Sequence, residues 1–199
     1  MKFQKIIFIL FLSSAAIWLN FILSQHNYDI TCLFDSRTYT GERLTLEENN
    51  ILNDTVYISG LGDFDQSDLE IASKAISDVF GLKCKIIPST RTTDKLYTSN
   101  GKLDSKNCSL LLNTTNKTVY VTNEYVVSDD KIVCGSSVSN GNFAIVSDNF
   151  NNHVRNTTLH EMAHTMGSDH CDNQCILGHI ELGEPNGQFC EECKKYLGL

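Results

Sequence analysis

Eleven residues in the last quarter of the chain carry the pattern whose chemistry is most specific. They run from His160 to His170 and have the sequence H-E-x-x-H-x-x-G-x-x-H. Residues four apart lie one above the other on an α-helix, so His160 and His164 can direct two imidazoles toward one ion. Gly167 lets the chain leave the helix in a left-handed turn, which brings His170 back as a third ligand. This pattern is typical of a zinc metallopeptidase.

The spacing predicts a catalytic zinc site rather than a structural one, because three protein ligands leave one position open for water. Zinc lowers the pKa of its water to about 7. Glu161 follows the first ligand and is placed to take the proton as general base and return it to the leaving amine. The expected reaction is hydrolysis of a peptide bond. The alternative is a chance pattern on an ordinary helix, and the glycine and third histidine at their required offsets argue against it.

The chain has eight cysteines, in two groups. The pairs at the C-terminal end are C-x3-C and C-x2-C, and their spacing favours a tetrahedral structural zinc. In an oxidising compartment the same residues would form disulfides, and spacing alone leaves both alternatives open. These residues are Cys171, Cys175, Cys190 and Cys193. The other four predict two disulfides of undetermined pairing; they are Cys32, Cys84, Cys108 and Cys134.

The first residues predict a targeting segment. Lys2 and Lys5 precede an apolar run over 6–23. This favours a signal peptide over 1–24 and a metallopeptidase domain over 25–199. The alternative is an uncleaved anchor, since about 20 apolar residues span a bilayer. We therefore expect a secreted or lumenal protein, which contacts a membrane only if the segment stays as an anchor.

Potential glycosylation sequons agree with that expectation. The predicted acceptors are Asn53, Asn107, Asn113 and Asn116. A fifth sequon, at Asn156, falls where the active-site helix is expected to begin.

Composition indicates one globular domain. The 199 residues are 41% hydrophobic and 20% charged, a balance that permits an ordinary core. The net charge is −8 and no basic stretch is concentrated anywhere, so nucleic acid is not an expected partner. The expected partner is a peptide or protein substrate, and we expect a monomer.

Strands and helices are predicted to alternate, which indicates a mixed α/β (α+β) fold with one sheet. A capping box at 67–70 and Gly81 bracket one helix, and the second helix ends near residue 166. Strands are expected at 55–59, 82–87, 118–121, 131–134 and 142–147, and 89–116 is predicted to be mostly loop.

The strand at 142–147 directly precedes the active-site helix. An extended substrate can pair with an exposed sheet edge. We therefore predict substrate contacts at Asn142, Phe143, Ala144 and Ile145. An ordinary interior strand is the alternative.

The residues after the third histidine resemble the archaemetzincins. That family has the pattern H-E-x-x-H-x-x-G-x-x-H-C-x4-C-x-M and a later C-x-x-C, and here Cys171 follows His170 directly. The match covers about 160–193, with weaker similarity over 118–147. The resemblance implies a single compact metzincin-like domain with a mixed twisted sheet, an active-site helix and a C-terminal Cys-rich zinc subdomain.

The resemblance also implies roles for individual residues. A catalytic zinc would bind His160, His164 and His170, with Glu161 as base. A structural zinc would bind Cys171, Cys175, Cys190 and Cys193.

The chain departs from the family pattern at several points. Three residues rather than four separate Cys171 from Cys175, and the segment to Cys190 is shorter. Leu177 stands where the pattern has the methionine that lies beneath the metal, a swap that conserves volume. The alternative function is a catalytically silent secreted zinc-binding glycoprotein that acts as a binding module. The intact Glu161 argues against it.

Overall fold

The computed structural model describes residues 55–112, 115–149, 153–178 and 187–199, all within a compact unit that spans Cys32–Leu199. The predicted signal segment 1–24 and the sequons at Asn53 and Asn113 lie outside the described residues. Among the described residues, no helix is both long and apolar enough to span a bilayer.

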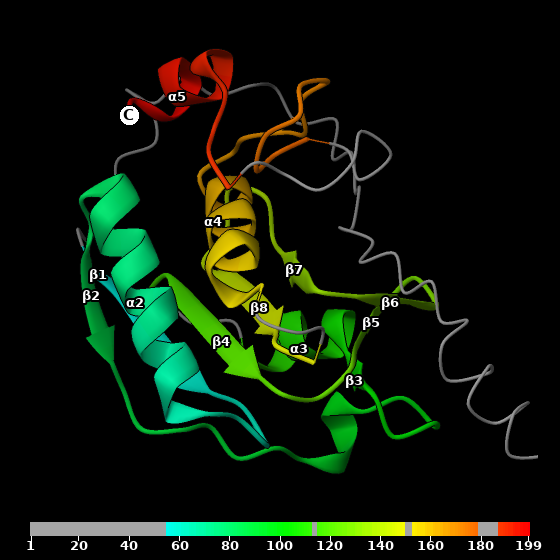
Figure 1. The fold of residues 1–199 in the computed structure, drawn as a ribbon. Coiled ribbons are helices and arrows are strands. Elements are labelled where there is room, and N and C mark those ends of the chain that lie inside the picture. Colours follow the sequence, from blue (N-terminus) through cyan, green and yellow to red (C-terminus); the bar gives the residue numbers. More distant parts are fainter. Residues whose placement is uncertain (1–54, 113–114, 150–152, 179–186) are drawn as a thin grey trace, which may run out of the picture. The chain divides into compact units, whose positions relative to one another are not determined.

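A five-stranded mixed sheet with the order β2-β1-β4-β8-β7 forms the centre of this unit (Figure 1). Neighbours from β2 to β8 pair in parallel, whereas β7 runs antiparallel to β8. The strands are β1 (Thr55–Gly60), β2 (Lys83–Ile86), β4 (Thr118–Thr122), β7 (Gly135–Ser137) and β8 (Phe143–Ser147).

Alternation along the strands gives the sheet two apolar faces. On β8, Ala144 and Val146 belong to one buried cluster, and Phe143 and Ile145 to the other. The first face is covered by α2 (Gln66–Phe80) and α4 (Val154–Thr165), which lie side by side (Figure 1). The other is covered by α3 (Ser105–Leu112) and a short 3-10 helix (Asp94–Leu96).

Helix α2 starts earlier than its predicted capping box. Asp65 occupies the N-cap position with an extended backbone, so Ser67 already lies within the first turn and cannot cap it. The capping-box prediction is therefore wrong. The predicted end is confirmed, because Gly81 takes the left-handed conformation at φ 66° and its N–H bonds to the Ser77 carbonyl.

The region predicted to be mostly loop holds regular structure. Besides α3 and the 3-10 helix it contains β3 (Leu103–Asp104), which pairs in parallel with β5 (Val126–Ser128). Strand β6 (Lys131–Val133) adds to β5 as an antiparallel hairpin. The local signal for α3 is Asp104, whose Oδ1 accepts the Asn107 N–H at 2.9 Å and so satisfies the first turn.

The prediction of two disulfides among the scattered cysteines is wrong. Cys84 and Cys108 carry free thiols. They lie on opposite faces of the sheet, Cys84 against the α2 side and Cys108 fully buried on the α3 side, so they cannot bridge. Cys134 is disulfide-bonded, and Cys32 lies outside the described residues.

A third apolar cluster attaches the C-terminal segment to the two main helices. It includes Leu159 and Ala163 of α4, Leu177 of the following segment, and residues of α5 (Glu191–Leu197). The Phe80 and Phe189 rings meet edge to face at 5.8 Å. This packing fixes the cysteine-rich segment beside the end of α4.

Candidate metal centre

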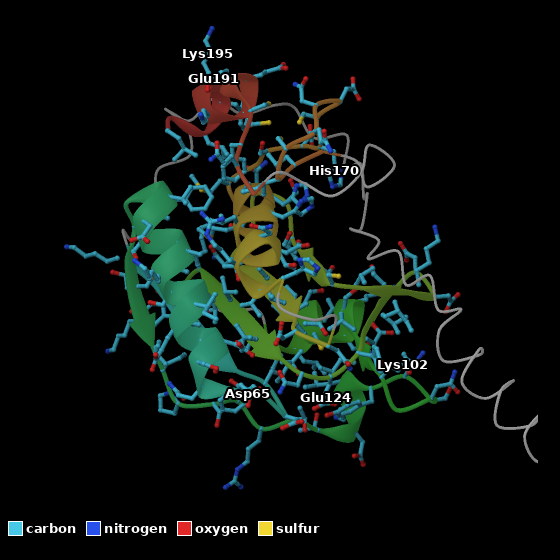
Figure 2. All side chains as sticks on the ribbon, viewed as in Figure 1. Asp65, Lys102, Glu124, His170, Glu191 and Lys195 are labelled. Carbon is cyan, nitrogen blue, oxygen red and sulfur yellow. The ribbon has the colours of Figure 1, made fainter. Side chains whose placement is uncertain are left out.

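Helix α4 carries His160, Glu161 and His164 among core residues. Both His160 and Glu161 are buried, at 0% and 2% exposure. The helix ends in a turn at Gly167, whose φ is 87°. A Cβ there would also meet the side chain of Asn140, so glycine is required on two grounds. The turn leads back to His170, as predicted (Figure 2).

A half-buried lysine holds the end of α4 in place. Lys117 Nζ donates to the Thr165 carbonyl at 2.8 Å and to the Gly141 carbonyl at 3.0 Å. Burial lowers the pKa of Lys117 to about 8. The lysine thus ties the last turn of α4 to the hairpin between β7 and β8.

The three imidazoles converge. His160 Nε2 lies 2.9 Å from His164 Nε2 and 3.1 Å from His170 Nε2. Around a tetrahedral zinc with Zn–N of about 2.0–2.1 Å, two nitrogens lie roughly 3.3 Å apart. The spacing is slightly tighter than that and fits one zinc-sized ion.

Carbonyl groups fix which nitrogen of each ring carries the proton. His160 Nδ1 lies 2.6 Å from the Ile176 carbonyl, and His164 Nδ1 lies 2.6 Å from the Ser168 carbonyl. A carbonyl only accepts, so each Nδ1 donates and each neutral ring turns an Nε2 lone pair toward the other. Burial, followed by the two neighbouring imidazoles, lowers the pKa of His160, which keeps it neutral. A cation between the lone pairs would remove their repulsion, so this donor set fits zinc.

Glu161 directly follows His160 on α4, and its carboxylate is held by β7. Its Oε2 accepts a 2.7 Å hydrogen bond from Ser137 Oγ. A Cβ on Gly135 would lie 2.7 Å from Glu161 Cγ and Oε1, so only glycine leaves room for the carboxylate. The sequence prediction missed both residues. Their only local signal is a run of small residues at 135–137, before the Asn140–Gly141 turn.

The expectation that residues 142–147 form an exposed sheet edge is wrong. Strand β8 pairs with β4 on one side and with β7 on the other, so the predicted contacts at Asn142, Phe143, Ala144 and Ile145 do not lie on an edge. The last three are buried in the core. The chain reverses at Asn140, with φ 53°, and this hairpin places β7 outside β8. Among the strands of the described residues, the edge beside Glu161 is therefore β7.

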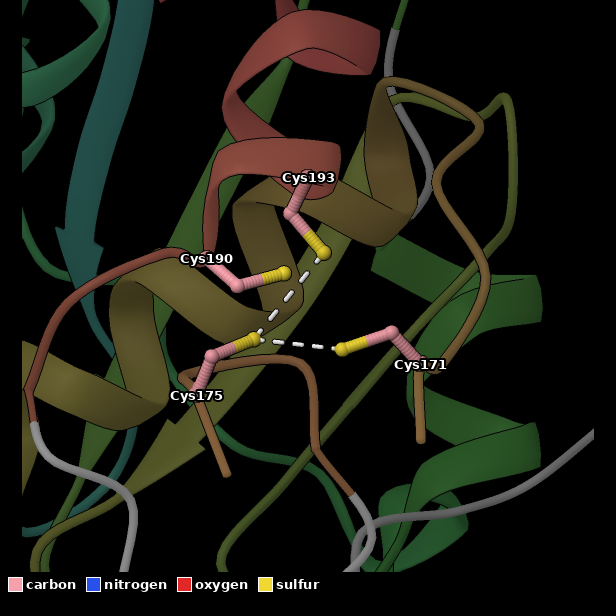
Figure 3. Close-up of side chains that lie close together, drawn as sticks. All are labelled: Cys171, Cys175, Cys190 and Cys193. Atoms are coloured by element: carbon pink, nitrogen blue, oxygen red, sulfur yellow. Dashed lines mark hydrogen bonds between the residues drawn. The ribbon is translucent and has the colours of Figure 1, made fainter. Parts of the chain in front are cut away.

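The four terminal cysteines form a second cluster (Figure 3). Their Sγ atoms all lie within 4.8 Å of one another, as free thiols. The distance from Cys175 Sγ is 3.2 Å to Cys171 and 3.9 Å to Cys193. Four thiolates around zinc, with Zn–S of about 2.3 Å, lie roughly 3.8 Å apart. Helix α5 contributes Cys193, and Cys190 directly precedes it.

Polar groups also point at these sulfur atoms. The Leu177 N–H donates to Cys175 Sγ at 3.3 Å, and Asn173 Nδ2 donates to Cys190 Sγ at 3.5 Å. Burial, then the contact with Cys175, raises the pKa of Cys171 to about 11. A metal bound here would therefore displace protons. The donor set fits a tetrahedral zinc.

One short segment connects the two clusters. Cys175 belongs to the thiol cluster, while the carbonyl of the next residue, Ile176, accepts the hydrogen bond from His160. Leu177 follows, fully buried against Leu159 of α4, in the position where the family pattern has methionine. The imidazole cluster thus depends on a carbonyl held by the cysteine loop.

Three solved structures resemble this chain, whereas no family model and no curated protein matches its sequence. Archaemetzincin from Archaeoglobus fulgidus, in complex with malonate, superposes with a TM-score of 0.64 at 19% identity, over 71% of this chain and 99% of that one. Archaemetzincin from Methanopyrus kandleri gives 0.63 at 17% identity, over 75% and 96%. The chain has the archaemetzincin fold. A zinc-dependent peptidase from Methanocorpusculum labreanum gives 0.59 at 16% identity, over 71% and 99%.

The archaemetzincin fold confirms the predicted class: mixed α/β, with the helix that carries the histidines packed on the sheet. The comparisons contradict the expectation of a secreted, lumenal or signal-anchored protein. The neighbours are two archaeal archaemetzincins and an archaeal peptidase. In this fold the terminal cysteines are gathered as free thiols, a state that oxidising compartments disfavour. Two predicted sequons lie in the described residues, at Asn107 within α3 and at Asn116. Their presence alone does not support secretion.

Proposed function

We propose that the chain is a zinc-dependent metallopeptidase whose domain covers 25–199. The observation that carries the proposal is the convergence of three Nε2 atoms, with the buried Glu161 next to the first of these histidines in the chain. His160, His164 and His170 would hold the catalytic zinc, with Glu161 as general base. The fold shared with a zinc-dependent peptidase supports this function.

Bound zinc would polarise the scissile carbonyl and lower the pKa of a bound water to about 7. Glu161 takes the proton from the attacking water and delivers it to the leaving amine. Ser137 keeps the Oε2 of Glu161 in one orientation through its hydrogen bond. The rings of His160 and His164 are held by their Nδ1 contacts to carbonyls, so the site needs little rearrangement before reaction.

The substrate is proposed to lie along β7. This strand is the edge of the sheet beside Glu161, and an extended peptide can add to such an edge through backbone hydrogen bonds. The assignment replaces the contacts expected on β8.

A second zinc is proposed on Cys171, Cys175, Cys190 and Cys193, where it would be structural. Four cysteines leave no open position for water. The free thiols and the N–H donors directed at their sulfur atoms support this role.

The decisive variant is Glu161→Gln, which keeps the shape of the side chain and removes the base. We expect peptide hydrolysis to fall by at least about 100-fold while zinc per chain is unchanged. Glu70→Gln, on the exposed face of α2, is the matched control. Undiminished hydrolysis by Glu161→Gln would exclude the mechanism. A fully zinc-loaded wild type that cleaves no peptide in a broad library would favour the binding module instead.

A further inference from the structure

Acidic and amide side chains gather where the parallel strands end. Asp65 lies in the segment after β1, Asn123 directly follows β4, and Asp148 directly follows β8. The carboxyl ends of parallel strands meet at one edge of a sheet, so these residues lie close together. Asp68, in the first turn of α2, joins them. Figure 2 shows Asp65 at the opposite end of the sheet from His170, so this group is separate from the imidazoles.

Three buried oxygen atoms here receive no hydrogen bond: Asp68 Oδ2, Asn123 Oδ1 and Asp148 Oδ1. The Asp68 side chain is only 6% exposed. Buried polar oxygens are nearly always paired, because leaving one unpaired costs about 1–3 kcal/mol. Two of these atoms belong to the neighbouring carboxyl groups of Asp68 and Asp148, a pair that lacks a positive partner.

The contacts around these atoms orient them. Asn123 Nδ2 donates to Asp65 Oδ2 at 3.3 Å, so its amide oxygen faces away from that carboxylate. The Asp148 N–H bonds to the Thr122 carbonyl at 2.9 Å, which fixes the backbone at the end of β8. The carboxyl groups of Asp68 and Asp148 lie within hydrogen-bonding range of each other. Two carboxylates that close require either a shared proton or a cation between them.

The described side chains do not provide that positive charge. The ion pairs in the described part of the chain are Lys74–Asp78 and Lys194–Glu191, and neither includes a residue of this group. Burial, followed by the charges of Asp148 and Asp65, raises the pKa of Asp68 to about 6. At neutral pH the carboxyl group of Asp68 is therefore largely ionised, and the neighbouring charge of Asp148 repels it.

We propose that Asp68, Asp148 and the amide oxygen of Asn123 bind a hard divalent cation, calcium or magnesium. Carboxylate and amide oxygens are the ligands these ions prefer, and magnesium in particular uses one or two carboxylates and keeps several waters. Thiol or imidazole ligands are not among these residues, so zinc would be disfavoured here. The ion would join the first turn of α2 to the ends of β4 and β8.

The test uses the full-length zinc-loaded protein at about pH 8, well above the pKa of about 6 of Asp68. Calcium and magnesium are titrated separately by calorimetry, and thermal unfolding is followed with and without each ion. We expect one ion per chain beyond the zinc content, and a saturable rise in Tm. Asp68→Asn and Asp148→Asn should each weaken binding by roughly tenfold or more. Asp78→Asn, an exposed acid on the same helix, should leave binding unchanged.

The variants remove a repulsion, so they are expected to fold, and their zinc content checks this. Absence of binding by the wild type at millimolar calcium and magnesium would overturn the proposal. Equal binding by Asp68→Asn and the wild type would overturn it as well. A wild type that binds neither ion but becomes more stable on acidification, unlike Asp68→Asn, would identify a carboxyl pair that shares a proton instead.

Discussion

Ser137 Oγ donates a 2.7 Å hydrogen bond to Oε2 of Glu161, which joins the edge strand β7 to helix α4. The serine lies 24 positions before the glutamate and outside the zinc-binding motif. It constrains the carboxylate from the same strand along which the substrate is proposed to bind. Placement of the base and docking of the peptide would thus share one structural element.

Removing that hydrogen bond should impair turnover more than binding. For Ser137→Ala we expect kcat to fall about tenfold, since a hydrogen bond to a charged group is worth about 1.5–3 kcal/mol. KM and zinc content should change little. Steady-state kinetics and metal analysis measure these quantities, and Ser137→Thr, which keeps the hydroxyl, should recover much of the rate. A Ser137→Ala enzyme with wild-type kcat would show that Glu161 needs no positioning from β7.

Gly167→Ala should disturb the third imidazole. A Cβ at this position is strained by the φ of 87° and would meet Asn140, so the turn that returns His170 must shift. We expect zinc affinity at the imidazole cluster to fall by about 10–100-fold. Competition with a chelator of known affinity provides the measurement.

The control for the Gly167 variant is Gly81→Ala. Gly81 also has a left-handed backbone, with φ 66°, but open space surrounds its position. That substitution should cost roughly 1–2 kcal/mol of stability and leave zinc binding unchanged. Equal zinc loss in both variants would mean that general instability, rather than the position of His170, explains the effect.

A substitution in the cysteine cluster should change the orientation of His160, because the Ile176 carbonyl that binds its ring follows Cys175 directly. Cys175→Ser removes a sulfur from the cluster and loosens the residue before the carbonyl that orients His160. We expect the loss of one zinc per chain and a further drop in peptide hydrolysis. Cys84→Ser, which alters a free thiol outside the cluster, is the control. Loss of one zinc with full activity would show that the two centres are independent.

Asp68 should make stability depend on pH in buffer free of calcium and magnesium. Burial, followed by the charges of Asp148 and Asp65, raises the pKa of Asp68 in the folded state to about 6, from an ordinary value of 3.8. The folded state therefore binds the proton more tightly, and stability falls as pH rises from about 4 to about 6. Above that range Asp68→Asn should be more stable than the wild type by on the order of 2 kcal/mol. Denaturant unfolding at several pH values, with Asp78→Asn as control, measures the difference; a difference independent of pH would contradict it.

The spacing of residues in the sequence predicted those parts of the site that depend on one helix and the turn after it. The spacing of His160, His164 and Gly167 determines their arrangement, since helix geometry and the left-handed turn act over a few residues. The same holds for the buried face of α2. These features needed no knowledge of the rest of the chain.

Non-local pairing explains the predictions that failed. Whether β8 is an edge depends on β7 turning back beside it, and the three small residues of β7 carry no strand signal. Ser137 reaches Glu161 only after that hairpin forms. The sequence alone allowed a disulfide between Cys84 and Cys108, but the two residues lie on opposite faces of the sheet.

The hydrogen bond between His160 and the Ile176 carbonyl depends on residues that are synthesised after α4. Helix α4 is made before Cys190 and Cys193, yet the segment that presents this carbonyl to His160 is held partly by those later residues. Until they emerge and join the cluster, a nascent chain has its motif histidines but not the support that aligns them. A hydrolase built this way would gain activity late, after every strand of its own sheet has been synthesised.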